Sequence, residues 1–473
     1  MEVNIKDWNV EDEGFWSKTG KKIADRNLWS SIPALLLAFS IWIMWGVLVK
    51  YMKEFGFNFG LTDGLISGSD AYISALKEVN SLYYTLPAIA GLAGATLRLP
   101  NSFLISLGGG RNVVFVTTTL LLIPAIGTGI ALSDVNTPYM LFAVMALLSG
   151  FGGGNFSSSM SNISFFYPKK NQGYALGMNA GLGSLGVAIM QKLIPFVITF
   201  SIFGGAAGAI ATAKGAQFDG LQNAAWVWVP LIALTSLLTF FRMNNVSTGT
   251  PSLPSTGKGI SKTLYMVALG LIAAGVGAFL LIGIPWESWG MKNSSMWIVL
   301  PTVIILAVQL MKHATPSEIK GNLKKQFSIL SDKHNWIMTV IYTMTFGSFI
   351  GYSMVFPKLA QDIFVYSNPL DLEWANPNAP NIMIWAFLGP MFGALVRPIG
   401  GIIADKVNSG AKVTMWSTIA QIIAALAVAY FVVQARATDS PELYWWPFFS
   451  AFMVLFLATG IGNGSTFRSI PYI

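Results

Sequence analysis

Long runs of apolar residues recur along the chain and are separated by short polar or charged segments. Each run is about 20 residues long, the length that a helix needs to cross the hydrocarbon core of a bilayer. The pattern predicts twelve helical spans, over residues 30–50, 80–107, 113–133, 138–166, 172–200, 224–243, 262–284, 294–312, 335–357, 381–404, 411–435 and 443–468. The chain is therefore predicted to be an all-α polytopic membrane protein.

Composition and charge support this prediction. Hydrophobic residues make up 53% of the chain and charged residues 11%, against roughly 25% charged residues in soluble domains. The net charge is +8, but Lys and Arg gather in alternate segments between the spans, with 18 on the side of the N-terminus and 7 on the other side. Because cytoplasmic segments are enriched in positive charge, we expect a multi-pass protein of the plasma membrane, the inner membrane of a bacterium, with a cytoplasmic N-terminus. Its surroundings are the lipid bilayer, and no nucleic acid is expected as a partner.

Short motifs repeat between the two halves of the chain. GATLR (94–98) in the second predicted span resembles GALVR (393–397) in the tenth, and GFGGGNFSSS (150–159) in the fourth resembles GIGNGSTF (460–467) in the last. Aligning these motifs predicts a cytoplasmic segment 1–29, an N-terminal six-helix bundle 30–243, a linker with an inserted helix pair 244–334, and a C-terminal bundle 335–473. On this alignment the C-terminal bundle is truncated to about four helices. We therefore expect either a fragment of a longer protein or a chain that lacks two helices of its repeat.

The repeated motifs place Arg98 and Arg397 at matching positions inside apolar helices. An arginine at membrane depth costs at least about 2.5 kcal/mol by insertion scales, so it usually faces a cavity. The alternative is a helix-end arginine that extends to the headgroups, but both residues are followed by further apolar sequence. Two such residues in related halves predict a pair of positive charges across a pseudo-symmetry axis. The planar guanidinium fork suits a small planar oxyanion.

Glycine, amide and aromatic residues surround these arginines in the sequence. The glycines favour close helix packing, or allow the backbone to approach a small solute. A buried amide without a partner is costly, so each asparagine either pairs across helices or contacts solute; we assign Asn179 to the solute and Asn155, Asn162 and Asn463 to packing. Tyr342 and Phe346 lie on one helical face, where they either pack in the core or against lipid, or wall a flat anion.

Several kinds of chemistry have no candidate residues. No Asp or Glu lies in the middle of a predicted span, and the two histidines, His313 and His334, fall in a predicted cytoplasmic loop. A proton relay normally needs an intramembrane carboxylate or histidine. The sequence pattern also contains no cluster of metal ligands and no nucleophile triad. We predict no enzymatic activity, no cofactor and no metal site.

The motif NFSSSMSNISFFYPKKNQGYALGMNAGLG (155–183) resembles the signature of the nitrate/nitrite porters, a family of the major facilitator superfamily. The chain's last residues, GIGNGSTFRSIPYI (460–473), resemble the second signature of that family, and DWNVEDEGFW, IADRNLW, GATLR and GALVR also match. The resemblance implies a major facilitator fold of two rocking helix bundles. Three departures stand out: residues 60–78 lengthen a loop, the pair at 262–312 resembles that of fourteen-helix relatives, and the chain ends inside the second signature.

The resemblance also implies a substrate site. Its substrate-clamping arginines fall on Arg98 and Arg397, and its site asparagine on Asn179. The further residues that it implies are aromatic walls and backbone contacts at signature glycines: Phe151, Tyr342, Phe346, Gly177 and Gly462.

The residues and the resemblance together predict transport of small inorganic anions, nitrate and nitrite, by a monomer. We expect nitrate/nitrite antiport by alternating access. Proton-coupled nitrate uptake is the alternative coupling, and a passive anion pore or an anion sensor is a more remote alternative. Direction of flux and preference between the two anions do not follow from the sequence.

Overall fold

The computed structural model describes residues 3–200, 203, 210–211, 217–218, 220–284, 286, 288–291, 294–365 and 376–469. Twelve helices in this part of the chain are long and apolar enough to cross a membrane. Their bounds are Glu13–Glu54, Asp70–Gly108, Gly110–Leu132, Tyr139–Ser164, Tyr174–Val197, Asn223–Arg242, Thr256–Gly283, Met296–His313, Lys333–Phe364, Ile382–Ala404, Gly410–Arg436 and Pro441–Phe467. The predicted number and order of the spans are therefore confirmed.

Several of these spans consist of more than one helical segment. The segments are α1 (Glu13–Phe15), a π-helical turn Trp16–Gly20, α2 (Lys21–Ile43), α3 (Trp45–Glu54), α4 (Asp70–Gly108), α5 (Gly110–Thr119), α6 (Leu122–Leu132), α7 (Tyr139–Ser164), α8 (Lys169–Val197), α9 (Asn223–Trp226), α10 (Trp228–Arg242), α11 (Thr256–Gly283), α12 (Met296–His313) and α13 (Ser317–Gln326). They continue with a 3-10 turn Phe327–Ser331, α14 (Lys333–Tyr342), a π-helical turn Thr343–Gly347, α15 (Ser348–Phe364), α16 (Ile382–Ala386), α17 (Leu388–Leu395), α18 (Arg397–Lys406), α19 (Gly410–Arg436), a 3-10 turn Pro441–Tyr444 and α20 (Trp445–Ser469).

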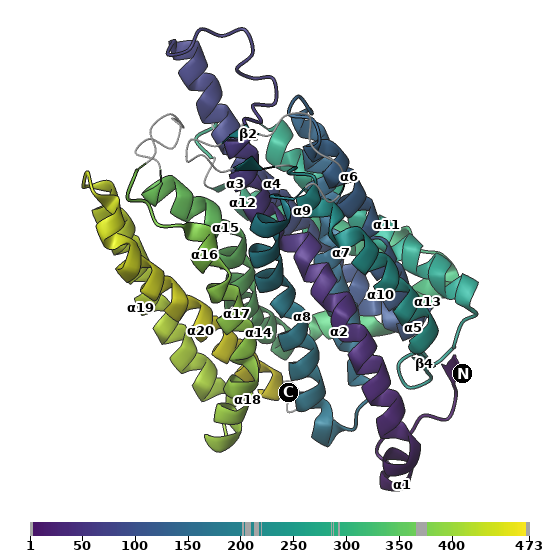
Figure 1. Ribbon diagram of the computed structural model, residues 1–473. Helices are drawn as coiled ribbons and strands as arrows, with labels where there is room; N and C mark the ends of the chain where they lie inside the picture. The colour runs from purple at the N-terminus through teal and green to yellow at the C-terminus, as the bar shows by residue number, and fades with distance from the viewer. Residues whose placement is uncertain are drawn as a thin grey trace.

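The helices form two groups that lie side by side (Figure 1). In the first group α4 packs on α7, α2 packs on α7 and α8, and α10 packs on α2 and α5. In the second group α17, α18 and α19 all pack on α20. The groups meet where α8 contacts α17 and α18 and where α3 contacts α15. We call the end of the helices that carries the N-terminus the near side, and the opposite end the far side.

The helix pair α11–α12 packs on the first group. α11 lies along α4 and also contacts α5 and α7, and α12 contacts α11 and α4. The predicted inserted pair therefore consists of two membrane-length helices placed beside α4. The residue boundaries of the four predicted segments of the chain stay a prediction.

The helix that contains the first span begins at Glu13, well before the predicted residue 30. The reason is that residues 13–29 are helical with one apolar stripe, so Ala24 and Leu28 pack with Trp8, Phe166 and other buried side chains. The indole nitrogen of Trp8 also donates to the carbonyl of Phe165, at 2.9 Å. A search for continuous apolar runs misses such an amphipathic extension, because its exposed face is charged.

Four two-residue strands complete the described structure. β1 (Asn4–Ile5) pairs in parallel with β4 (Asn245–Val246), and β2 (Ile210–Ala211) pairs in antiparallel fashion with β3 (Gln217–Phe218). The pairing of β1 with β4 ties the start of the chain to the residues that follow α10.

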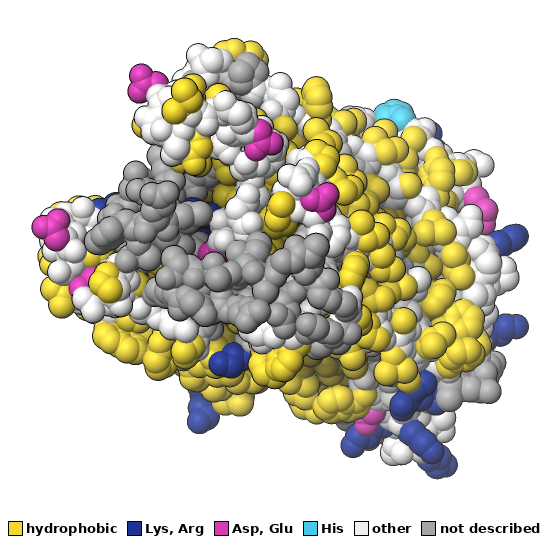
Figure 2. Space-filling model, turned by 45° about the horizontal axis from the view of Figure 1, so that its top comes forward, with side chains coloured by type: hydrophobic (Ala, Val, Ile, Leu, Met, Phe, Trp, Pro, Cys, Tyr) yellow, Lys and Arg dark blue, Asp and Glu magenta, His cyan; other side chains and the backbone are white. Residues whose placement is uncertain are grey.

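The lateral surface of the protein is apolar. Large hydrophobic side chains are exposed along α10, α12 and α19, and Trp297 is exposed to 83%. Figure 2 shows hydrophobic side chains over much of the described surface, with most of the lysines and arginines near its edge. A contiguous exposed apolar surface of this kind is typical of contact with a membrane.

Candidate anion-binding site

Arg98 lies in the last third of α4, among aromatic rings. Its Nε donates to the carbonyl of Gly153 on α7, at 3.1 Å. The guanidinium carbon lies 4.7 Å from the ring centroid of Phe346, 5.1 Å from that of Phe156 and 5.3 Å from that of Trp42. Rings within about 6 Å of a guanidinium attract it through their negative faces. These rings therefore support a positive charge at this depth without neutralising it.

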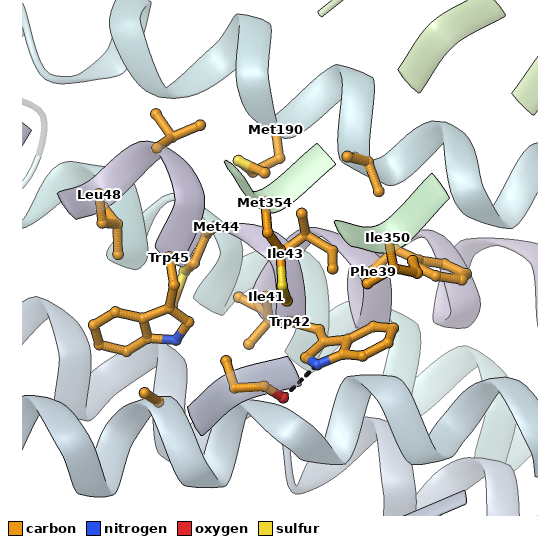
Figure 3. Packing of buried hydrophobic residues seen from close by; sticks show 14 of the residues in the cluster. Phe39, Ile41, Trp42, Ile43, Met44, Trp45, Leu48, Met190, Ile350 and Met354 are labelled. Carbon is orange, nitrogen blue, oxygen red and sulfur yellow. Dashed lines mark hydrogen bonds between the residues drawn. The ribbon is translucent and has the colours of Figure 1, made fainter. Parts of the chain in front are cut away.

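The position of Trp42 is fixed by a hydrogen bond. Its indole nitrogen donates to the carbonyl of Ala90 on α4, at 2.6 Å, the dashed line in Figure 3. The indole packs between α4 and α7 at glycines, and a Cβ at Gly94 would lie 2.3 Å from it. A Cβ at Gly153 would lie 2.5 Å from the Cα of Gly94. The glycine-rich stretch of α7 thus serves the close helix packing that the sequence favoured.

Arg397 is the first residue of α18, and its side chain is only 1% exposed. Its Nη1 donates to the carbonyl of Ala180 on α8, at 3.3 Å, so the guanidinium reaches across from the second helix group to the first. The guanidinium carbon lies 4.6 Å from the ring centroid of Phe349 and 5.2 Å from that of Phe346. The snorkelling alternative is excluded for Arg397, because a buried side chain does not reach the headgroups.

One phenyl ring lies against both arginines. Phe346 is 0% exposed and belongs to the π-helical turn Thr343–Gly347, a type of turn often found at functional sites. The two guanidinium carbons are no more than about 10 Å apart, the sum of their distances to this ring. The two arginines, predicted as a pair from the related halves of the chain, thus lie against the same ring of Phe346.

The other aromatic rings stack on Phe346. The ring of Tyr342 stacks on it with centroids 5.2 Å apart and planes at 19°, and the ring of Phe156 does so at 4.8 Å and 26°. The predicted aromatic pair on α14 and the π-helical turn therefore lies beside the arginines. Phe151 on α7 belongs to the buried hydrophobic core. The ring of α7 that contacts Arg98 is that of Phe156.

Several polar atoms of the arginines and their neighbours are buried without hydrogen bonds. They are Nη2 of Arg98, Nε and Nη2 of Arg397, the hydroxyl of Tyr342, Oδ1 of Asn179 and both amide atoms of Asn463. Neither arginine forms an ion pair within the described residues. A buried donor without an acceptor costs about 1–3 kcal/mol, and more when it is charged. The unpaired nitrogens of Arg98 and Arg397 therefore favour an anionic ligand.

The predicted amide residues divide into two kinds. Asn179 donates from Nδ2 to the Oγ of Ser159 at 2.9 Å, which leaves its Oδ1 as the buried unpaired atom. Asn155 accepts from the Thr117 hydroxyl at 2.9 Å and so links α7 to α5, as predicted for a packing residue. Asn463 lies beside the hydroxyl of Tyr342, and neither of its amide atoms has a hydrogen bond of good geometry.

The two candidate glycines differ in their surroundings. A Cβ at Gly177 on α8 would meet no atom within 4 Å, so this position borders open space. A Cβ at Gly462 on α20 would lie 3.0 Å from Cγ2 of Thr345, so Gly462 allows α20 to pack on the π-helical turn.

Three aromatic residues beside the arginines were not predicted from the sequence: Trp42, Phe156 and Phe349. Phe156 could have been noticed because it directly follows Asn155 within the long signature. Trp42 carries no such signal, since it lies in the first span among other apolar residues.

A cavity of about 370 Å³ extends from Arg98 and Phe346 toward the far side. Its walls are mainly apolar residues of α4 and α15, and Tyr84 and Lys358 line its far end. Beside this cavity α3 and α15 touch, and a Cβ at Gly46 would lie 2.3 Å from the carbonyl oxygen of Met354. Figure 3 shows Met354 and Ile350 packed against residues of the first span, including Phe39 and Trp42.

A buried charged cluster joins the two helix groups on the far side. Asp362 on α15 accepts from Lys358 at 2.5 Å and from the Tyr84 hydroxyl of α4 at 2.5 Å, and it lies 3.6 Å from the Nζ of Lys53 on α3. Gln361 donates to Glu54 at 3.1 Å. Lys358 is 1% exposed. We call these residues the far-side cluster; sequence spacing could not predict it, because its members come from three separate helices.

The chain is similar in sequence and in fold to known transporters. It is 34% identical over 474 residues to the nitrate/nitrite transporter NarU of Escherichia coli (strain K12), covering 99% of this chain and 78% of that protein. It is 32% identical over 473 residues to the probable nitrate/nitrite antiporter NarK2 of Thermus thermophilus, covering 99% and 82%. The xylose transporter XylE from E. coli, in a partially occluded inward open conformation, matches with a TM-score of 0.52 and 11% identity over 93% of this chain and 85% of that one. No protein-family model matches the chain.

The structural likeness defines the fold as that of a major facilitator superfamily transporter. The relatives named above are transporters as well, in agreement with the prediction that the protein is not an enzyme. With about a third of its residues identical to such relatives over nearly its full length, the chain belongs to the nitrate/nitrite transporter family.

Proposed function

We propose that the protein exchanges nitrate and nitrite across the membrane by alternating access, with Arg98 and Arg397 clamping the anion. The observation that carries this proposal is the convergence of the two arginines, one from each helix group, on Phe346. Their buried unpaired nitrogens are donors for a small oxyanion. The names of the relatives support nitrate and nitrite as the transported anions.

Each nearby group has a role in this proposal. A planar anion lies against the ring of Phe346, and each guanidinium donates to it from one side. Tyr342 and Asn179 complete the polar surroundings, and Phe156 and Trp42 hold Arg98 in place. The backbone of α8 near Gly177 borders the open space through which the anion passes.

The two charges explain why exchange is favoured over net flux. Two unit charges no more than about 10 Å apart repel one another by at least roughly 1.7 kcal/mol at an effective dielectric constant near 20. A carrier without anion must close around this repulsion, whereas a bound anion offsets it. The return of the empty carrier is therefore slow, and nitrate moving one way is coupled to nitrite moving the other way.

Counterflow in proteoliposomes tests the coupling. Vesicles loaded with nitrite take up isotopically labelled nitrate, and vesicles without internal anion show little uptake. A control without protein sets the leak. Nitrate uptake that needs no internal nitrite and follows an imposed pH gradient would contradict exchange and favour proton coupling.

We place the protein in the inner membrane of a bacterium as a monomer with a cytoplasmic N-terminus. The distribution of Lys and Arg between the two sides supports this orientation. The near side is then cytoplasmic, and the far-side cluster faces the opposite compartment.

A further inference from the structure

Asn463 is buried beside Tyr342 of the candidate site, and neither of its amide atoms has a hydrogen bond of good geometry. It is 1% exposed, and both its Nδ2 and its Oδ1 are buried without a hydrogen bond. Buried amides normally satisfy at least one of their two polar atoms. The residue sits beside the hydroxyl of Tyr342, which is also without a hydrogen bond of good geometry.

The residues on either side of Asn463 fix its place. A Cβ at Gly464 would lie 1.9 Å from the carbonyl oxygen of Arg397, so α20 packs directly on the start of α18. Gly462 packs on Thr345, next to Phe346. Asn463 is therefore held between the Arg397 backbone and the π-helical turn, and Tyr342 beside it is within electrostatic reach of both arginines.

We propose that Asn463 is a specificity-determining residue that favours nitrate over nitrite. This inference rests on the proposed function. Nitrate offers three oxygens and nitrite two, and the two guanidinium forks suffice for two oxygens. The Nδ2 of Asn463 donates to the third oxygen of nitrate, and its Oδ1 accepts from the Tyr342 hydroxyl. Nitrite has no third oxygen, so it leaves the amide donor unpaired.

A purely structural role for Asn463 predicts a different outcome on substitution. Replacing a buried, unpaired amide by an apolar side chain of similar size is nearly neutral or stabilising. Asn463→Leu therefore leaves the thermal stability of the anion-free protein unchanged or raised in either case. The separation between the two roles comes from anion binding alone.

The test is calorimetric titration of the full chain in detergent with nitrate and with nitrite. Asn463→Leu is expected to raise the Kd for nitrate by about tenfold or more, the value of one hydrogen bond to a charged group, and the Kd for nitrite by less than about threefold. Asn223→Leu is the control for loss of a buried amide in α9, outside the site; its Oδ1 is unpaired and its Nδ2 donates to the carbonyls of Val197 and Phe200. This control is expected to leave the ratio of the two Kd values unchanged.

The outcomes distinguish the two proposals. A wild-type protein that binds neither anion would overturn the proposed function. If the wild-type protein binds both anions and Asn463→Leu shifts their Kd values equally, or not at all, the role of Asn463 is overturned while the function stands.

Discussion

Neutralising one arginine gives the sharpest test of the anion clamp. Arg397→Gln keeps a planar side chain of similar shape but removes one charge next to Phe346. An anion about 4 Å from the guanidinium carbon loses roughly 4 kcal/mol of attraction at an effective dielectric constant near 20. The repulsion between the two arginines is present both with and without the anion, so its loss does not enter the change in binding free energy. The cost of roughly 4 kcal/mol corresponds to nitrate binding that is weaker on the order of a thousandfold.

Arg397→Lys separates charge from geometry. The lysine keeps the charge but cannot donate in a fork, so we expect an intermediate loss of about tenfold in nitrate affinity. Both variants are measured by calorimetric titration in detergent. Arg436→Gln is the control, because Arg436 lies exposed at the far end of α19 and its loss should leave the nitrate Kd unchanged.

Two results would refute this reasoning. Equal affinity in Arg397→Lys and the wild-type protein would mean that the site is a simple electrostatic well without bidentate recognition. Unchanged affinity in Arg397→Gln would mean that the anion does not bind between the arginines.

Three further substitutions test the structure around the site. Gly46→Ala places a Cβ about 2.3 Å from the carbonyl oxygen of Met354, so it should force α3 and α15 apart. The labelling of cysteines engineered on the far side should then increase, and unchanged labelling would contradict the tight contact. Asp362→Asn leaves Lys358 buried without its carboxylate partner. We expect the free energy of unfolding to fall by about 3 kcal/mol, which lowers the Tm. A double variant that also removes the lysine charge should recover the stability. Phe156→Ala removes a ring that lies against both Arg98 and Phe346. Arg98 must then be ordered when nitrate binds, which costs about 1 kcal/mol, so nitrate binding should weaken by about fivefold. Wild-type affinity would show that the ring only fills space.

The spans and the arginine pair could be predicted from the sequence because each depends on local information. Span length follows from runs of apolar residues, and Arg98 and Arg397 stand out because charge at membrane depth is costly. Tyr342 and Phe346 could be predicted as a pair because four residues separate neighbours on one helical face.

The partners across helices could not be predicted in this way. Trp42 and Phe156 lie in the first and fourth spans, and both reach Arg98 in the second. Spacing within one helix carries no information about which residue of a neighbouring helix lies opposite. The far-side cluster escaped prediction for the same reason, and lysines near helix ends were counted as loop charges.

A single ring that touches both guanidiniums affects how mutational data on this protein should be read. Any substitution that moves Phe346 alters the surroundings of Arg98 and of Arg397 at once. The free-energy costs of changing the two arginines are therefore not independent, and a double variant will lose less affinity than the two single variants added together. Non-additive effects at this position arise from the shared ring. Single-residue scans will therefore overstate how much each half of the transporter contributes to the affinity for the anion.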